Sequence, residues 1–425
     1  MSLVRISSSV LHGNISIPPS KSITHRAIIC AALANGISNI SPIFMSSDVC
    51  ATIRAISNLG AKVSVYGNSL IVDSTCMMNK KKVTIDCEES ASTLRFLIPI
   101  IAAKGIEGKF TGKGLLPKRP LDIYYDCLSS KGIEFKQCMS NYNLPLKISG
   151  LMKPGKFLVP GNISSQFISG ILLAAPILNG EVTIELTTPL ESAAYVNLTI
   201  SVMEDFGIKI ERTKYGWHVP ANQSYAPCNY KIESDWSQAA FFMAAGAINS
   251  NIALSGLNID SKQSDKKIID IIKQIGADVH WNNDRLIISH KNLNSFNIDA
   301  SQIPDLVPIL SVIGAFSNGE SIIGNASRLR IKESDRLNAI CSGLSKLGAN
   351  ITQNADSLHI IGKDQLSGGY VSGFNDHRIV MALSIAALNS SDETIISHAN
   401  SIDKSYPSFF KDYNSLGGNA NMFNN

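Results

Sequence analysis

The stretch Ala51–Asp73, ATIRAISNLGAKVSVYGNSLIVD, decides the fold. It starts as an amphipathic helix, passes through Leu59-Gly60, and continues as an alternating strand, a Gly67-Asn68 turn and a second strand. A glycine just after a helix takes the left-handed conformation that ends the helix, and Gly-Asn suits a tight hairpin. The stretch therefore predicts one helix followed by a two-stranded hairpin.

The same pattern recurs along the whole chain. The later copies are YYDCLSSKGIEFKQCMSNYNLPLKIS, LTISVMEDFGIKIERTKYGWHVP, IIDIIKQIGADVHWNNDRLIIS, LNAICSGLSKLGANITQNADSLHIIG and a truncated FFKDYNSLGGNANMF. Their glycines, with the first, are Gly60, Gly132, Gly207, Gly276, Gly348 and Gly417, spaced by 72, 75, 69, 72 and 69 residues. Helix–glycine–strand junctions are common in α/β proteins, but six at nearly even spacing favour true repetition. A period near 70 is long for a solenoid and fits a βαβαββ unit, so we expect an α/β fold of two similar domains with three units each.

Composition indicates an ordinary globular protein. The 425 residues are 44% hydrophobic and 17% charged, with a net charge of +4, which suits anionic small molecules as well as weak nucleic-acid contact. None of the eight cysteines has CxxC spacing, and several lie in apolar runs, so we expect reduced thiols in a cytoplasmic protein. The amino terminus lacks the apolar segment of a signal peptide, and the longest apolar runs are too short to span a bilayer.

Polar and basic residues gather where apolar helices begin. In IPPSKSITHR, residues 17–26, two prolines end a strand, and Ser20 or Ser22 can cap the next helix beside Lys21 and Arg26. Similar helix starts or loops are CEESASTLR (87–95), TGKGLLPKRPLD (111–122), SSQF (164–167) and NDHR (375–378). Each alone also fits a plain helix cap or an exposed basic turn. Together they indicate a site for a ligand with several negative charges, because helix amino termini bind anions.

The densest cluster of charge is RIKESDRL, residues 330–337. Arg328, Arg330 and Lys332 alternate, so an extended strand would place them on one face. Glu333 among these cations is a candidate acid or base, although a solvated charged face is the alternative. No GxxxxGK[ST], GxGxxG or HExxH motif occurs, and the basic stretches lack interleaved aromatics, so nucleotide, zinc and nucleic-acid sites have little support.

These six segments and a seventh near the end of the chain, KSYPSFF (404–410), resemble the enolpyruvyl transferase family, and within it the branch whose acceptor is shikimate 3-phosphate. The segments PSKSITHRA, SASTLR, LPKRPLD, SSQF, RIKESDRL, NDHR and KSYPSFF occur in the family's order between residues 18 and 410. The resemblance implies an inside-out α/β barrel with domains 16–232 and 1–15 plus 233–425, crossovers near 15–19 and 230–235, and a substrate cleft between the domains. It implies transfer of the enolpyruvyl group of phosphoenolpyruvate to the 5-hydroxyl, with release of phosphate, in the shikimate pathway to chorismate and aromatic amino acids.

The resemblance also implies a role for each matching residue. The implied ligands of shikimate 3-phosphate are Lys21, Ser22, Arg26, Ser164, Ser165, Gln166, Ser192, Asp305 and Lys332. The implied ligands of phosphoenolpyruvate are Lys21, Ala91, Arg119, Gln166, Arg336, Arg378 and Lys404. Asp305 would take the hydroxyl proton, and Glu333 and Lys21 would move protons at the methylene carbon and the phosphate. Neither metal nor organic cofactor is implied, and we expect a monomer that contacts neither nucleic acid nor membrane.

Two departures from the family pattern affect the expected function. Glu89-Ser90-Ala91 stands where the family commonly has Asn-x-Gly, and an alanine there is associated with tolerance to glyphosate, so we expect a tolerant enzyme.

The nearest alternative is the sister enzyme that transfers enolpyruvyl to UDP-N-acetylglucosamine. That enzyme usually carries a reactive cysteine on the loop that is here TGKGLLPKRPLD, which has none. A non-catalytic relative is the other alternative, and the joint presence of Lys21, Asp305 and Glu333 disfavours it.

Overall fold

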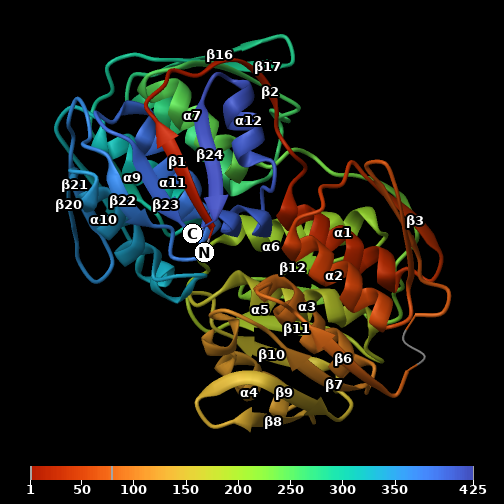
Figure 1. Ribbon diagram of the computed structural model, residues 1–425. Helices are drawn as coiled ribbons and strands as arrows, with labels where there is room; N and C mark the ends of the chain where they lie inside the picture. The colour runs from red at the N-terminus through yellow and green to blue at the C-terminus, as the bar shows by residue number, and fades with distance from the viewer. Residues whose placement is uncertain (1, 78–79, 425) are drawn as a thin grey trace. The chain divides into compact units, whose positions relative to one another are not determined.

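The computed structural model describes residues 2–77 and 80–424, which fold as two compact units. We call residues 19–233 the middle unit, and residues 1–18 with 234–425 the terminal unit. The chain passes from one unit to the other at Pro18–Pro19 and again at Glu233–Ser234. Figure 1 shows the elements of each unit.

The middle unit contains three four-stranded sheets with the same strand order. The sheets are β6 (Lys82–Asp86), β7 (Glu107–Thr111), β9 (Tyr142–Ser149) and β8 (Glu134–Met139); β10 (Gly155–Val159), β11 (Val182–Leu186), β13 (Gly216–Val219) and β12 (Glu211–Arg212); and β14 (Asn229–Lys231), β3 (Ile37–Ser41), β5 (Ser69–Asp73) and β4 (Lys62–Tyr66). In each sheet the first two strands are parallel and the other pairs antiparallel. Each of the first two sheets is therefore one βαβαββ unit, whereas the third takes its first strand, β14, from the end of the middle unit.

The terminal unit repeats this order three times. Its sheets are β2 (His12–Ser16), β15 (Asn251–Ser255), β17 (Arg285–Ser289) and β16 (Asp278–Asn282); β18 (Asn297–Asp299), β19 (Glu320–Gly324), β21 (Leu358–Ile361) and β20 (Asn350–Gln353); and β22 (Gly369–Ser372), β23 (Thr394–Ser397), β1 (Ser2–Ser7) and β24 (Asn419–Asn424). The amino-terminal strand β1 pairs with β23 and β24. This pairing explains why the sixth copy of the sequence pattern is truncated: its last strand comes from the other end of the chain.

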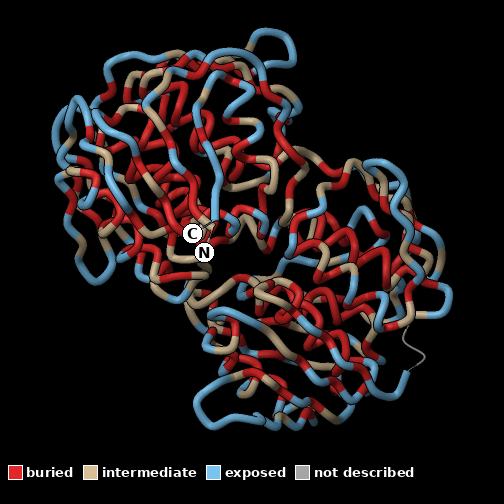
Figure 2. Tube along the Cα trace, in the orientation of Figure 1, coloured by how far each residue is buried: buried red, intermediate tan, exposed pale blue. Residues whose placement is uncertain are grey.

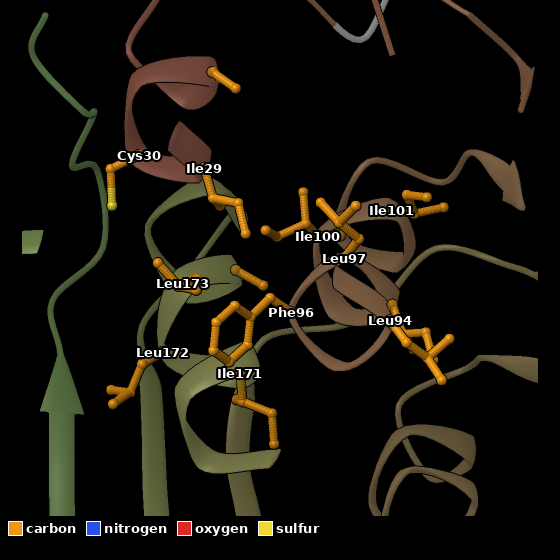
Figure 3. Close-up of a cluster of buried hydrophobic side chains, with 14 of the residues drawn as sticks. Ile29, Cys30, Leu94, Phe96, Leu97, Ile100, Ile101, Ile171, Leu172 and Leu173 are labelled. Atoms are coloured by element: carbon orange, nitrogen blue, oxygen red, sulfur yellow. The ribbon is translucent and has the colours of Figure 1, made fainter. Parts of the chain in front are cut away.

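Three apolar helices form the interior of each unit. They are α1 (Lys21–Leu33), α3 (Ala91–Ala103) and α5 (Ser165–Ala174) in the middle unit, and α7 (Trp236–Ile248), α9 (Val307–Ala315) and α11 (His377–Ala386) in the terminal unit. Every residue of α7, α9 and α11 is buried, so these helices are apolar all round, as the interior of a unit requires. Figure 2 shows the buried stretches along these helices, and Figure 3 shows side chains of α1, α3 and α5 gathered around Phe96.

Six amphipathic helices accompany the hairpins, and each ends at one of the repeat glycines. The helices are α2 (Ser47–Asn58), α4 (Asp122–Ser129), α6 (Ala193–Asp205), α8 (Ile268–Gln274), α10 (Arg336–Lys346) and α12 (Phe409–Ser415). All six glycines have φ between 85° and 112°. The predicted left-handed caps are therefore confirmed, as is the inside-out α/β class, in which helices form the interior. None of the helices within the described ranges is long and apolar enough to cross a membrane.

Candidate active site

Most of the predicted site residues of the middle unit lie at the caps or first turns of its helices; Arg26 lies one turn further along α1, and Arg119 lies in a loop. Ser20 caps α1, so that Lys21 and Ser22 are its first residues, and Lys21 Nζ lies 2.8 Å from Asp48 Oδ2 in the first turn of α2. Ser90 caps α3, and its hydroxyl accepts from the N–H of Thr93. Helix starts that carry a lysine and hydroxyls suit an anion, because the helix dipole adds to their charge.

Arg26 is buried and held by three hydrogen bonds. Its Nε donates to Thr199 Oγ1 at 2.7 Å, and its two terminal nitrogens donate to the carbonyls of Ser22 and Tyr195 at 2.7 and 3.2 Å. Its guanidinium also lies 5.0 Å from the centre of the Phe96 ring. Burial lowers the pKa of Arg26 to about 10, so the group stays charged near neutral pH. Tyr195 and Thr199 lie on α6, which begins directly after Ser192, so these bonds fix the start of α6 to Arg26.

Arg95 joins the remaining predicted residues of this unit. It donates to Ser164 Oγ at 3.4 Å, to Gln166 Oε1 at 2.9 Å and to the carbonyl of Pro120 at 3.0 Å. Ser164 caps α5, and Gln166 Nε2 donates in turn to Ser92 at 3.0 Å. Arg95 therefore connects Ser165, the first residue of α5, with the loop that carries Arg119 and with the first turn of α3, which begins at Ala91.

Five of the six predicted residues of the terminal unit, Asp305 included, come together in one cluster. The carboxylate oxygens of Asp305 lie 2.9 Å from Arg336 and 2.9 Å from Arg378, and Lys332 Nζ lies 3.9 Å away. Glu333 contacts the same Arg336 at 2.5 Å. Burial alone would raise the pKa of the Asp305 carboxyl, but Arg378, Lys332 and Arg336 outweigh it and hold the pKa well below its ordinary value.

Asp376 fixes the arginines of this cluster. This carboxylate is fully buried; it caps α11 by accepting from the N–H of Arg378 at 2.9 Å, and it accepts from Arg336 Nε at 2.8 Å and Ser334 Oγ at 3.0 Å. Lys404 Nζ, from a neighbouring turn, donates to the carbonyl of Asn375 at 2.5 Å. Arg336 is 1% exposed, so its buried positive charge is stabilised by its carboxylate partners rather than by water.

Sequence reasoning left out three acids and misassigned one segment. Asp48, Asp265 and Asp376 were not chosen as site residues, because a lone Asp at a helix start is ordinarily a cap. Asp265 is buried beside Ser237. Its burial, and to a smaller extent the charge of Asp305, raises its pKa to about 6. Their side-chain partners described above are 27 to 42 residues away in the sequence, so only the fold could reveal them.

The expected strand carrying Arg328, Arg330 and Lys332 on one face is wrong. Residues Ser327–Ile331 form a 3-10 helix between β19 and α10. Arg328 donates to the carbonyl of Ser301, whereas Arg330 pairs with Asp335. The alternation failed as a signal because each arginine has its own partner, which the short helical turn satisfies and an extended strand would not.

Taken together, the inside-out fold and its clusters of cations at helix starts define an α/β enzyme for anionic ligands. A family model described as EPSP synthase (3-phosphoshikimate 1-carboxyvinyltransferase) matches residues 6–413. The chain belongs to the EPSP synthase family.

Individual relatives agree with this assignment. A 3-phosphoshikimate 1-carboxyvinyltransferase of Clostridium novyi is 46% identical over 98% of both chains, and one of Clostridioides difficile is 43% identical over 100% of this chain and 99% of its own. Among solved structures, EPSP synthase from Acinetobacter baumannii has a TM-score of 0.84 at 23% identity over the full length of both chains. The enolpyruvyl transferase NikO from Streptomyces tendae has a TM-score of 0.79 at 16% identity over 99% of this chain and 98% of its own. These two structures are alike in fold.

Proposed function

We propose that this chain transfers the enolpyruvyl group of phosphoenolpyruvate to the 5-hydroxyl of shikimate 3-phosphate and releases phosphate. This is the step of the shikimate pathway that leads towards chorismate and aromatic amino acids. The observation that carries the proposal is the cluster in which Arg336 and Arg378 both contact Asp305, within a chain of the EPSP synthase family. Two arginines and a carboxylate combine the groups that bind an anionic donor and deprotonate a hydroxyl acceptor.

Two sets of residues bind the ligands in this proposal. Shikimate 3-phosphate is bound by Lys21, Ser22, Arg26, Ser164, Ser165, Gln166, Ser192, Asp305 and Lys332. Phosphoenolpyruvate is bound by Lys21, Ala91, Arg119, Gln166, Arg336, Arg378 and Lys404. Each set includes residues of both units. The support is that hydrogen bonds and ion pairs already order these side chains within each unit, which lowers the entropy cost of binding.

The reaction needs a base for the hydroxyl, and we assign that role to Asp305. With Arg336 and Arg378 on it, this carboxylate is a weak base. When the carboxylate of phosphoenolpyruvate takes over the two arginines, Asp305 loses two positive partners and its pKa rises. Binding of the donor therefore makes the base stronger at the moment when it is needed.

The remaining steps conserve atoms and protons. A proton from Glu333 or Lys21 adds to the methylene carbon C3 while the 5-oxygen attacks C2, which gives a tetrahedral intermediate. Loss of a proton from C3 with departure of phosphate restores the double bond as an enol ether. The cations of the site stabilise the phosphate as it leaves. No step calls for a metal or an organic cofactor.

We extend the proposal to a monomer that acts in the cytoplasm on these two small molecules, without nucleic acid or membrane. Both substrates are phosphorylated and charged, and such molecules do not cross an apolar bilayer unaided. Measuring the molecular mass in solution and locating a tagged chain in cells test these two statements.

We also propose tolerance to glyphosate, which rests on Ala91. This residue is the first of α3 and is 5% exposed, so its methyl lies at the helix start where the slightly longer glyphosate would meet it. One methyl in a tight site is worth about 10- to 200-fold in discrimination. Ala91→Gly should lower the inhibition constant for glyphosate by at least about tenfold. Low-micromolar inhibition of the unaltered enzyme in the presence of ordinary phosphoenolpyruvate would contradict the proposal.

Phosphate release tests the main proposal. The purified chain should release phosphate when both shikimate 3-phosphate and phosphoenolpyruvate are present, and Lys21→Met should abolish the release. Lys82→Met is the matched control, because Lys82 also has a carboxylate partner at 2.8 Å, Glu107, but is 76% exposed. Release with UDP-N-acetylglucosamine in place of shikimate 3-phosphate would support the sister activity, and no release with either acceptor would refute a transferase.

A further inference from the structure

Four buried polar side chains form a line of hydrogen bonds through the middle unit. His25 Nδ1 lies 2.7 Å from Thr52 Oγ1, which lies 2.7 Å from Thr93 Oγ1, and Thr93 Oγ1 donates to Ser90 Oγ at 2.8 Å. All four residues are at most 1% exposed. The line joins α1, α2 and α3, because His25, Thr52 and Thr93 lie one on each helix.

The proton positions along the line follow from its last bond. Thr93 uses its only hydroxyl proton on Ser90, so the proton in the 2.7 Å bond between Thr52 and Thr93 comes from Thr52, whose other acceptor, the carbonyl of Asp48, is farther away at 3.5 Å. His25 then donates to Thr52 through an Nδ1 proton. His25 Nε2 is then a bare acceptor, and it is buried with no hydrogen-bond partner in the part of the chain that the structure describes. Burial lowers the pKa of His25 well below its ordinary value, and the positive charges of Lys21 and Arg26 lower it further, so the ring stays neutral.

This line lies one helical turn from the Lys21–Asp48 ion pair. Lys21 precedes His25 by four residues on α1, and Asp48 precedes Thr52 by four residues on α2. Residues four apart share a helix face, so the two contacts are successive cross-links between the same two helices. Thr93 extends the second cross-link to the first turn of α3, which begins at Ala91.

We propose that His25, Thr52 and Thr93 are positioning residues that hold Lys21 and the start of α3 in the geometry that phosphoenolpyruvate requires. This inference rests on the function proposed above. A buried polar atom without a partner is destabilising, and an apolar residue in place of His25 would avoid that cost, so packing alone does not account for the histidine. The hydrogen bonds fix the register of three helix starts, and a shift of about 1 Å in such a site costs up to about a hundredfold in rate.

Substitutions that remove or keep bonds of this line test the proposal. His25→Leu removes one bond of the line, and Thr52→Val and Thr93→Val remove two each, whereas His25→Asn and Thr52→Ser keep a donor or a hydroxyl. Tyr225→Phe is the matched control, because it removes a buried hydroxyl that donates to the carbonyl of Leu173 in the same unit. Steady-state kinetics of all variants should be compared with their thermal stability.

The expected result separates positioning from stability. The three bond-removing variants should raise KM for phosphoenolpyruvate and lower kcat by on the order of tenfold each. KM for shikimate 3-phosphate should change less than about twofold, and His25→Asn and Thr52→Ser should recover most of the loss. Unchanged kinetics in a folded Thr52→Val or Thr93→Val protein, with stability lowered as in Tyr225→Phe, would overturn the proposal.

Nitrogen-15 NMR of the unaltered protein provides a check that does not depend on activity. Near pH 6, where an ordinary histidine is largely charged, His25 should be neutral with its proton on Nδ1. A protonated ring or an Nε2–H tautomer would refute the hydrogen-bond directions and with them the positioning role. By contrast, a chain with the expected tautomer but no phosphate release would refute the proposed function alone.

Discussion

The substitution Asp376→Asn tests whether the buried charge cluster of the terminal unit holds its arginines in place. Asparagine has nearly the same shape as aspartate, and its carbonyl oxygen can still cap α11. The change removes the negative charge that lies 2.8 Å from Arg336 Nε, where both side chains are at most 1% exposed. Removing one partner of a buried ion pair costs about 3–5 kcal/mol. Since Arg336 keeps Asp305 and Glu333 as partners, we expect about 3 kcal/mol, the lower end of that range.

Asp335→Asn is a matched control in the same unit. Asp335 also caps a helix, α10, and also pairs with an arginine at 2.9 Å, Arg330, but these side chains are 39% and 31% exposed. Exposed ion pairs contribute about 0–1 kcal/mol, so this variant should lose less than about 1 kcal/mol. The two variants should therefore differ by about 2 kcal/mol, or roughly 30-fold in the unfolding equilibrium constant.

Urea denaturation of the full chain measures this difference. Trp236 and Trp281 lie in the terminal unit, so their fluorescence follows the unit that carries both substitutions. Asp376→Asn should also raise KM for phosphoenolpyruvate, because Arg336 loses the partner that orients it. Equal loss of stability in the two variants would refute the reasoning from burial.

Two further changes have expected results of their own. The pKa of Asp265 is raised from 3.8 to about 6, so the folded chain binds the proton more tightly than the unfolded chain does; this contribution to stability is present below about pH 4 and is lost as the pH rises through 6. In the unaltered protein the free energy of unfolding should therefore fall by on the order of 3 kcal/mol between about pH 4 and pH 6, and Asp265→Asn should abolish this fall. Urea titrations at a series of pH values measure it. If the free energy of unfolding of Asp265→Asn depends on pH as steeply as that of the unaltered protein, the prediction is contradicted. Gly114→Ala should raise KM for phosphoenolpyruvate several-fold, because Gly114 has φ of 57°, which strains a residue with a Cβ in the loop that carries Arg119, and the added Cβ would also push the Glu89 carboxylate aside. An unaltered KM would show that the loop tolerates the change.

The repeat and its helix caps could be predicted from the sequence because both are local. A glycine at each helix end and an alternating strand after it depend on neighbouring residues alone, and all six glycines have the expected positive φ. The completion of the sixth sheet by β1 could not be predicted in this way, since the pairing joins residues more than 380 positions apart. The family resemblance supplied the class and the expected site residues, and the family assignment is confirmed.

The internal organisation of the site depended on the fold. Ser20, Ser90 and Ser164 could be recognised as caps from their places before apolar runs. The partner of Lys21 is Asp48, and one partner of Arg336 is Asp376; in the sequence each is only an ordinary acid at the start of a helix. A buried charge needs a partner of opposite charge. The sequence does not identify that partner, because the fold decides which helix starts lie next to one another.

The most direct test of the proposed reaction follows a carbon-13 label at C2 of phosphoenolpyruvate. After incubation with shikimate 3-phosphate and the purified chain, the label should appear by NMR in an enol ether carbon bonded to the 5-oxygen of shikimate 3-phosphate, together with free phosphate. Label found in pyruvate would reveal hydrolysis rather than transfer. Label that stays in phosphoenolpyruvate, or that enters only a UDP-sugar, would contradict the account.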